Sequence, residues 1–373
     1  MSHFFNFDWR TYLALYPDVA AKGVLGRAKA YFHWWSHGRF EGRYFPPYRP
    51  PAAYPEERRI DQGEIIAQLK NRRIPVLFCF DMEPDDPPTE PGWDGARATI
   101  DLAESIRPQL VENTATQASF CWFWRLDPQI TSMTEPSGDL QKLLGSEMER
   151  LQATGDEMGV HLHCYRPEPG GLGWQLDYAD TRWVEECIES GFASYEKLFG
   201  RPPSANRFGD RWYDDKALAV VQRLGARYDL TAEPDVTCQP SSAVARGDFP
   251  DMRGLPTSPF RAPVDQINPP GGDPLWSIPI TTGRPWVTRS RKGPVFSLNP
   301  ALEPRLFRQI INTSLVEGAD ILTMVLTTKI MGCPLQRAVV EKNLRFVADH
   351  FAIGRMVATR PDEALSMIAT KEN

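Results

Sequence analysis

The chain has 373 residues, enough for one large domain with a buried core and a small additional unit. Its net charge of -6 and pI near 5.7 argue against nucleic acid as the main partner, because phosphate binding needs a basic surface. No apolar run reaches the length of a membrane span and the N-terminus lacks a signal-peptide pattern, so we expect a cytoplasmic protein.

Residues 1–43 are predicted to form a small helical unit. "FDWRTYLALYPDVAAKG" carries an apolar stripe that ends at Gly23, and "GRAKAYFHWWSHGRFEGR" follows it. The pattern resembles a short repeat of bacterial proteins. A unit this short is hard to stabilise alone, so we expect it to pack on the main domain or on a partner protein. Residues 44–60 include "YFPPYRPPAAYPEERR" and predict an extended Pro-rich linker, which leaves 61–373 as the main domain.

After the linker, apolar strand-like runs alternate with helix-like segments. Runs of this kind occupy residues 74–81, 117–125, 158–165, 204–209, 226–231, 275–280 and 320–326. Strands that alternate with helices at intervals of roughly 40 residues predict a parallel sheet, and this number of strands favours a closed or nearly closed barrel. We therefore predict an α/β fold, a distorted (β/α)7-type barrel. Three of the six cysteines lie in these runs and none forms a CxxC pair, so we expect buried free thiols.

Polar side chains stand at the ends of these runs, where the chemistry of such a barrel is found. The first run ends in Asp81 and Glu83, and the third contains His161 and His163. The two imidazoles share a face because side chains at i and i+2 of a strand point the same way. A carboxylate with two imidazoles is a common ligand set for a catalytic zinc ion that activates water, which suits hydrolysis of an amide or ester. The alternative for the histidines is a hydrogen-bonded surface pair.

The order of these motifs resembles the polysaccharide deacetylases with a NodB homology domain (carbohydrate esterase family 4), in the branch with Asp-x-Glu and His-x-His motifs. The likeness covers residues 74 to about 360 and includes "DMEPDD", "ASFCWFW", "GVHLH" and "NRFGDRWYDDKALAVVQRLGARYDLTAEP". It implies that Asp81 is the general base and that Arg207 orients it, although a structural ion pair is the alternative for Arg207. It also implies that Glu83, His161 and His163 hold a divalent metal, zinc.

One departure concerns the family's His-Ser motif, whose histidine protonates the leaving amine. In the aligned stretch "TMVLTTKIMGCP", Leu326 stands at that place, and only His350 follows it. Amide hydrolysis then needs another acid, such as protonated Asp81. Two other interpretations stay open: a catalytically silent protein of this fold that binds a glycan or a partner, and a metal-free glycosidase that uses Asp81 and Glu83.

The resemblance implies an N- or O-acylated sugar of a bacterial glycan or glycolipid as substrate. Aromatic rings in loops after strand ends are candidates for stacking on sugar rings, with ordinary packing as an equal alternative. The candidate substrate contacts are Trp93, Trp174, Arg211 and Trp212. Asp85 and Asp86 precede a Pro-rich turn and predict helix capping or solvated charge instead.

Overall fold

The computed structural model describes residues 7, 9, 12–13, 16, 19, 22–24, 26–38, 65, 67, 69, 72–85, 92–133, 138–168, 170, 173–236, 246–247, 250–262, 274–284, 295–351 and 356–370. The linker predicted at 44–60 lies outside the described residues, as do Asp86, Cys238 and the side chain of His350.

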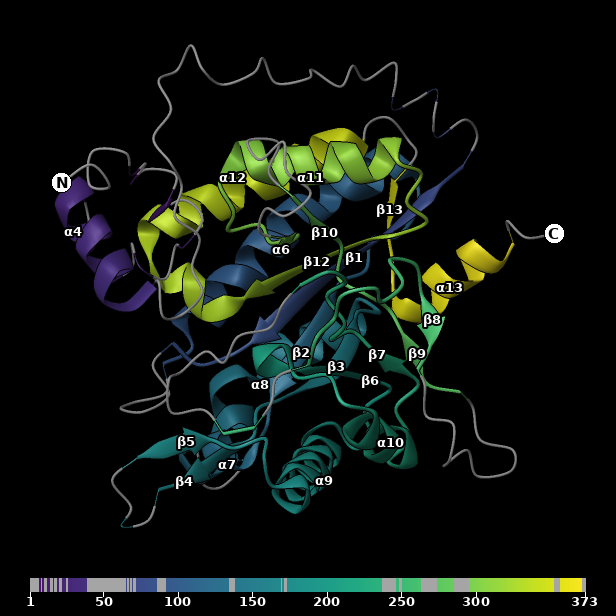
Figure 1. Cartoon of the computed structure of the whole chain (residues 1–373). Helices are drawn as coiled ribbons and strands as arrows, with labels where there is room; N and C mark the ends of the chain where they lie inside the picture. Colours follow the sequence, from purple (N-terminus) through teal and green to yellow (C-terminus); the bar gives the residue numbers. More distant parts are fainter. Residues whose placement is uncertain are drawn as a thin grey trace.

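Seven parallel strands form a curled sheet in the order β12-β1-β2-β3-β6-β7-β9 (Figure 1). Antiparallel β8 extends one edge, and β13 pairs with β1. The edges approach each other, since the backbone N–H of Thr281, beyond β9, donates to the carbonyl of Thr323 in β12 at 2.9 Å. The structure confirms the predicted α/β barrel-like fold. The strands are β1 (Ile74–Met82), β2 (Cys121–Arg125), β3 (Glu157–Leu162), β6 (Ala205–Phe208), β7 (Tyr228–Asp229), β8 (Phe260–Arg261), β9 (Trp276–Ser277), β12 (Leu322–Thr327) and β13 (Met356–Ala358).

Helices surround the sheet (Figure 1), and their sequences explain where they begin. Asp180 caps one by accepting the backbone N–H groups of residues 182 and 183, and Asp214 caps the next in the same way. Two short hairpins project from the sheet: β4 (Tyr165–Pro167) with β5 (Trp174–Leu176), and β10 (Thr282–Gly283) with β11 (Phe296–Ser297). The helices are α6 (Asp94–Thr114), α7 (Pro128–Met133), α8 (Gly138–Ala153), α9 (Thr181–Phe199), α10 (Asp215–Arg223), α11 (Pro304–Val316), α12 (Pro334–Phe351) and α13 (Pro361–Ala369).

The longer strands β1, β2, β3, β6 and β12 bury both of their faces, and successive side chains of β1 and β2 alternate between two apolar clusters. Leu77 and Cys79 of β1 belong to the cluster inside the curl of the sheet, together with Val325 of β12. Phe78 and Phe80 belong to the larger cluster between the sheet and the helices. By this alternation the next inward positions along β1 are Asp81 and then residue 83, so strand parity places their side chains at the mouth of the curl.

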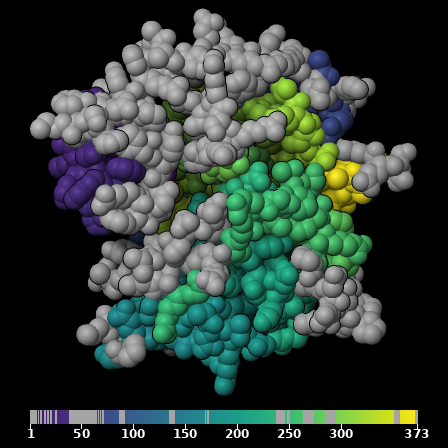
Figure 2. Space-filling model, in the orientation of Figure 1, coloured from purple at the N-terminus to yellow at the C-terminus, as the bar shows by residue number. Residues whose placement is uncertain are grey.

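The N-terminal segment contains α4 (Arg27–His33) and the short π-helix η1 (Trp34–Gly38), which lie at the surface on the side opposite α13 (Figures 1 and 2). Phe7, Tyr12, Val19 and Ala30 form a small cluster of their own. Tyr16 packs against both this cluster and the main core, so the segment does contact the main domain.

The cysteines of the described residues are free thiols, buried except for half-buried Cys333, as expected. Within the described part of the chain, no helix is both long enough and apolar enough to cross a bilayer.

Candidate metal centre

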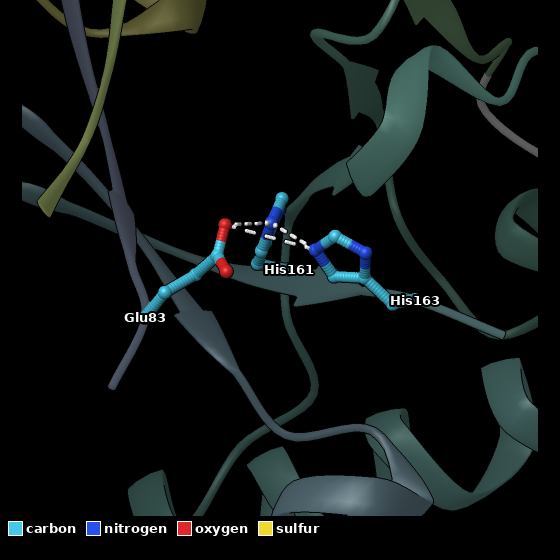
Figure 3. Close-up of side chains that lie close together, drawn as sticks. All are labelled: Glu83, His161 and His163. Atoms are coloured by element: carbon cyan, nitrogen blue, oxygen red, sulfur yellow. Dashed lines mark hydrogen bonds and ion pairs between the residues drawn. The ribbon is translucent and has the colours of Figure 1, made fainter. Parts of the chain in front are cut away.

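Three buried side chains converge at the ends of β1 and β3: Glu83, His161 and His163 (Figure 3). The carboxylate Oε1 of Glu83 lies 3.4 Å from Nε2 of His161 and 3.7 Å from Nε2 of His163. The two Nε2 atoms are 3.1 Å apart. The structure therefore brings the three predicted ligands together, and we call them the ligand trio.

The outer ring nitrogens fix where the imidazole protons lie. His161 Nδ1 is 3.0 Å from the carbonyl oxygen of Arg207, and His163 Nδ1 is 2.6 Å from Oδ2 of Asp210. Both oxygens only accept, so each Nδ1 donates and each neutral ring presents the lone pair of Nε2 to the other. Two lone pairs 3.1 Å apart repel unless a cation lies between them. The two Nε2 atoms and Oε1 of Glu83 are three ligand atoms of the kind that zinc binds. They fit a zinc ion that keeps a fourth coordination position open for water or substrate.

Without a metal, a proton takes the place of the cation. Burial and the Arg125 guanidinium lower the pKa of His163, but Asp210 and Glu83 outweigh them and raise the pKa to about 9. Burial also raises the pKa of Glu83, but Lys329 and the two histidines outweigh it and hold that pKa well below its usual range. A metal ion must displace this proton, so its affinity rises with pH.

Asp81 and Arg207 form a buried pair beside the trio. Arg207 Nε donates to both carboxylate oxygens of Asp81, at 2.9 and 3.1 Å, and one terminal nitrogen donates to the carbonyl of Leu230 at 2.7 Å. Another terminal nitrogen lies 3.6 Å from Oε1 of Glu233. Asp81 Oδ1 is 3.8 Å from Nδ1 of His161, so a carboxylate held by a guanidinium stands next to the trio.

Arg125 is a buried residue that contacts Glu83 and that the sequence alone did not single out. One terminal nitrogen donates to Oε2 of Glu83 at 3.1 Å, Nε donates to Asp127 at 2.7 Å, and the other terminal nitrogen donates to Gln129 at 2.5 Å. Asp127 also accepts the backbone N–H of His163 at 3.2 Å. The signal was present, because Arg125 ends an apolar strand run in the same way as Asp81 does.

The turn after β6, η3 (Gly209–Arg211), shapes the other side of the trio. Asp210 and Arg211 both adopt left-handed backbone conformations, with φ of 52° and 59°. These conformations cost energy in residues other than glycine and are typical of functional turns. A Cβ atom on Gly209 would lie 2.1 Å from Cε1 of His163, so only glycine lets this ring rest on the turn.

The burial of two of the tryptophans corrects the prediction that they stack on sugar rings. Trp93 is 2% exposed and belongs to the core, so it is not a surface for stacking on sugars. Trp212 is 7% exposed and stacks on Tyr178 with ring centroids 4.2 Å apart. These rings follow strand ends, but they turn toward the helices, where apolar area is buried. Trp174 is half-buried in β5. Asp85 caps α6 by accepting the backbone N–H groups of residues 94 and 95, as expected.

The interpretation of Leu326 as the residue at the acid's place is wrong. Leu326 is fully buried, pairs with Phe80 in the ladder and lies with it in the cluster under the helices. Asp81 pairs with Thr327 instead, so the inward position at the end of β12 is Thr327. Leu326 therefore faces away from the ligand trio, because neighbouring residues of a strand point to opposite faces.

Comparisons with known proteins give matches among solved structures. A probable polysaccharide deacetylase from Pseudomonas aeruginosa PAO1 is 14% identical, covering 87% of this chain and 98% of that chain, with a TM-score of 0.46. Puue allantoinase is 15% identical over 80% of this chain and 91% of that chain, with a TM-score of 0.47. A peptidoglycan deacetylase from Bacillus subtilis is 11% identical over 81% of this chain and 94% of that chain, with a TM-score of 0.36. No family model and no curated protein matches. The matched structures thus include deacetylases, and the activity of this chain has to be inferred from its own side chains.

Proposed function

We propose that this chain is a metal-dependent hydrolase that removes an acyl group, acetyl in the first instance, from a sugar of a bacterial glycan or glycolipid. The observation that carries the proposal is the ligand trio, in which two imidazole lone pairs and a carboxylate oxygen converge with Asp81 beside them. Burying several ionisable side chains together lowers the stability of a fold, because each loses its contact with water. Such clusters are typical of functional sites.

Each neighbouring group then has a role. A zinc ion held by Glu83, His161 and His163 would act as a Lewis acid on the acyl carbonyl and on the attacking water. Asp81, held by Arg207, takes the proton that the water loses as its oxygen bonds to the acyl carbon. Asp81 returns this proton to the nitrogen or oxygen that leaves as the acyl bond breaks.

The second candidate function is a catalytically silent protein that binds a glycan or a partner. It is favoured by the end of β12, where the inward residue is Thr327 rather than a group that titrates near neutral pH.

If the chain is a hydrolase, the same absence of a proton donor at Thr327 affects its substrate preference. An ester's leaving group needs less protonation than an amide's, so we expect esters to be cleaved more readily than amides.

The test separates the metal ligand from the base. We expect Glu83→Gln to lose bound zinc, measured by elemental analysis of the purified chain. Asp81→Asn should keep the zinc and lose turnover of 4-nitrophenyl acetate by about 10²–10⁴-fold. The reverse pattern would exchange the two roles. Wild-type protein with zinc bound that releases acetate from neither the aryl ester nor an acetamido sugar would favour the silent protein.

A further inference from the structure

The charged groups around the ligand trio are unevenly exposed. Five carboxylates belong to the trio, contact it, or pair with Arg207 beside it, and no more than 10% of any of their side chains is exposed: Asp81, Glu83, Asp127, Asp210 and Glu233. Two of the four cations, Arg125 and Arg207, are equally buried. The other two, Lys329 and Arg211, have side chains that are 46% and 49% exposed. Among the described residues, a ligand that enters from solvent therefore meets positive charge.

Each exposed cation is held by a buried carboxylate. Lys329 lies in the 3-10 turn η4 (Thr328–Gly332) directly after β12, and its Nζ donates to Oε2 of Glu83 at 3.3 Å. Arg211 lies in η3 after β6, and its Nε donates to Oε2 of Glu233 at 2.6 Å. These bonds hold two long side chains at the rim, so less rotamer freedom remains to be lost when a ligand binds.

Both cations are also connected, through buried carboxylates, to the groups that would react. Lys329 shares Glu83 with the trio, and Glu83 is its one hydrogen-bond partner among the described residues, which leaves two of its three N–H donors for a ligand. Arg211 reaches Asp81 through Glu233 and Arg207. A ligand bound by Lys329 would thus lie next to Glu83 of the trio, and one bound by Arg211 would lie next to Glu233.

We propose that the acylated sugar carries a carboxylate, as a sugar acid does, and that Lys329 and Arg211 bind this group. The inference rests on the proposed hydrolase function, since it assigns the substrate class of the same site. A sugar carboxylate can accept hydrogen bonds from both cations, and hydrogen bonds between charged groups are stronger than neutral ones.

Binding to the zinc-loaded full chain tests the assignment without relying on turnover. The probes are sodium glucuronate and the neutral methyl glucoside, with dissociation constants measured by NMR titration. We expect glucuronate to bind at least about tenfold more tightly than the neutral sugar, and Lys329→Gln or Arg211→Gln to remove about that factor from the ratio of the two affinities. Lys329→Arg keeps the charge and should keep the preference.

Arg345→Gln is the matched control, because Arg345 is 52% exposed and pairs with Glu341 on the surface of α12. A similar loss in this variant would reduce the effect to overall charge and overturn the proposal. Equal binding of the two sugars would overturn it as well, and so would inorganic phosphate binding more tightly than glucuronate with the same dependence on Lys329.

The two proposals fail separately. If the wild-type chain cleaves 4-nitrophenyl acetate but binds both sugars equally, the hydrolase stands and the sugar acid is wrong. If glucuronate is preferred through Lys329 and Arg211 but no acyl group is released, the sugar-acid site stands and the hydrolase is wrong.

Discussion

The two oxygens of Glu83 have separate partners. Oε1 faces the imidazoles of His161 and His163, whereas Oε2 accepts from Arg125 at 3.1 Å and from Lys329 at 3.3 Å. These contacts hold the carboxylate with Oε1 toward the two imidazoles, as expected of a metal ligand that binds through a single oxygen. Supporting contacts of this kind orient ligands and typically change metal affinity by 10- to 100-fold when they are removed.

Strand parity also decides where a missing proton donor can be restored. Thr327 pairs with Asp81 and stands at the inward position, whereas Leu326 lies in the core under the helices. We expect Thr327→His to raise the hydrolysis of an acetamido sugar at least about tenfold, because a positioned general acid is typically worth 10²–10⁴-fold. The measurement is acetate release with zinc bound in both proteins.

Leu326→His is the matched variant at the neighbouring position. We expect it to lower the melting temperature without raising turnover, because it places a polar ring among buried apolar side chains. Faster amide hydrolysis in Leu326→His than in Thr327→His would show that the register at the end of β12 is misassigned.

At the scale of elements, the sequence predicts those parts of the site that belong to long, regular strands. The runs of β1 and β3 are apolar, and their polar ends carry Asp81, Glu83 and both histidines. Contacts between distant segments are a different matter. Asp210 reaches His163 through a turn of left-handed residues, and neither φ > 0 nor this pairing follows from local composition. The burial of Trp93 and Trp212 depends on which helices cover the loops, which a single sequence does not specify.

The η3 turn leads to a prediction about Gly209. Because a Cβ there would meet Cε1 of His163 at 2.1 Å and Nε2 at 2.2 Å, Gly209→Ala must move the ring away from His161 and Glu83. We expect the zinc affinity to fall by about 10-fold or more, since one of the ligands is displaced. Competition with a chelator of known affinity measures the change.

Gly173→Ala serves as the control, because a Cβ at Gly173 comes no closer than 3.4 Å to Glu168, an ordinary contact. Its zinc affinity should match that of the wild type. If Gly209→Ala also retains full affinity, then the position of the His163 ring does not depend on the turn.

At the scale of the whole molecule, apolar and polar regions are separated along the barrel. The interior toward the start of the strands is apolar and is closed by Ala364 of α13, whereas the interior at their ends contains buried charges. Each buried charge costs desolvation energy that its partners only partly repay. The apolar clusters therefore provide most of the stability, and part of it is lost at the end of the barrel where the candidate site lies.

Asp229 of β7 shows this cost outside the ligand trio. It is fully buried, and it accepts from Asn206 Nδ2 at 2.8 Å and from the backbone and side chain of Thr231 at 3.0 and 2.9 Å. Burial raises the pKa of Asp229 to about 6, although these hydrogen bonds act to lower it. An unfolded aspartate titrates near 3.9, so the folded state binds this proton more tightly. The resulting stabilisation is complete below about pH 4 and is lost as the pH rises through about 6.

We expect Asp229→Asn to remove this dependence, because the amide has nearly the same shape and no charge. Relative to the wild type, the variant should gain about 3 kcal/mol in free energy of unfolding between pH 4 and pH 7.5, the equivalent of two pKa units. Asn206 can adapt, since its Oδ1 is buried without a hydrogen-bond partner among the described residues and can accept from the new amide. Urea unfolding at several pH values, with a chelator present so that metal uptake does not contribute, measures the difference.

Asp180→Asn is the control, and its pH dependence should have the opposite sign. Arg166 lowers the pKa of Asp180, so the wild type loses the stabilisation from that carboxylate as the pH falls. A difference between wild type and Asp229→Asn that stays constant with pH would mean that Asp229 is not protonated more readily in the folded chain.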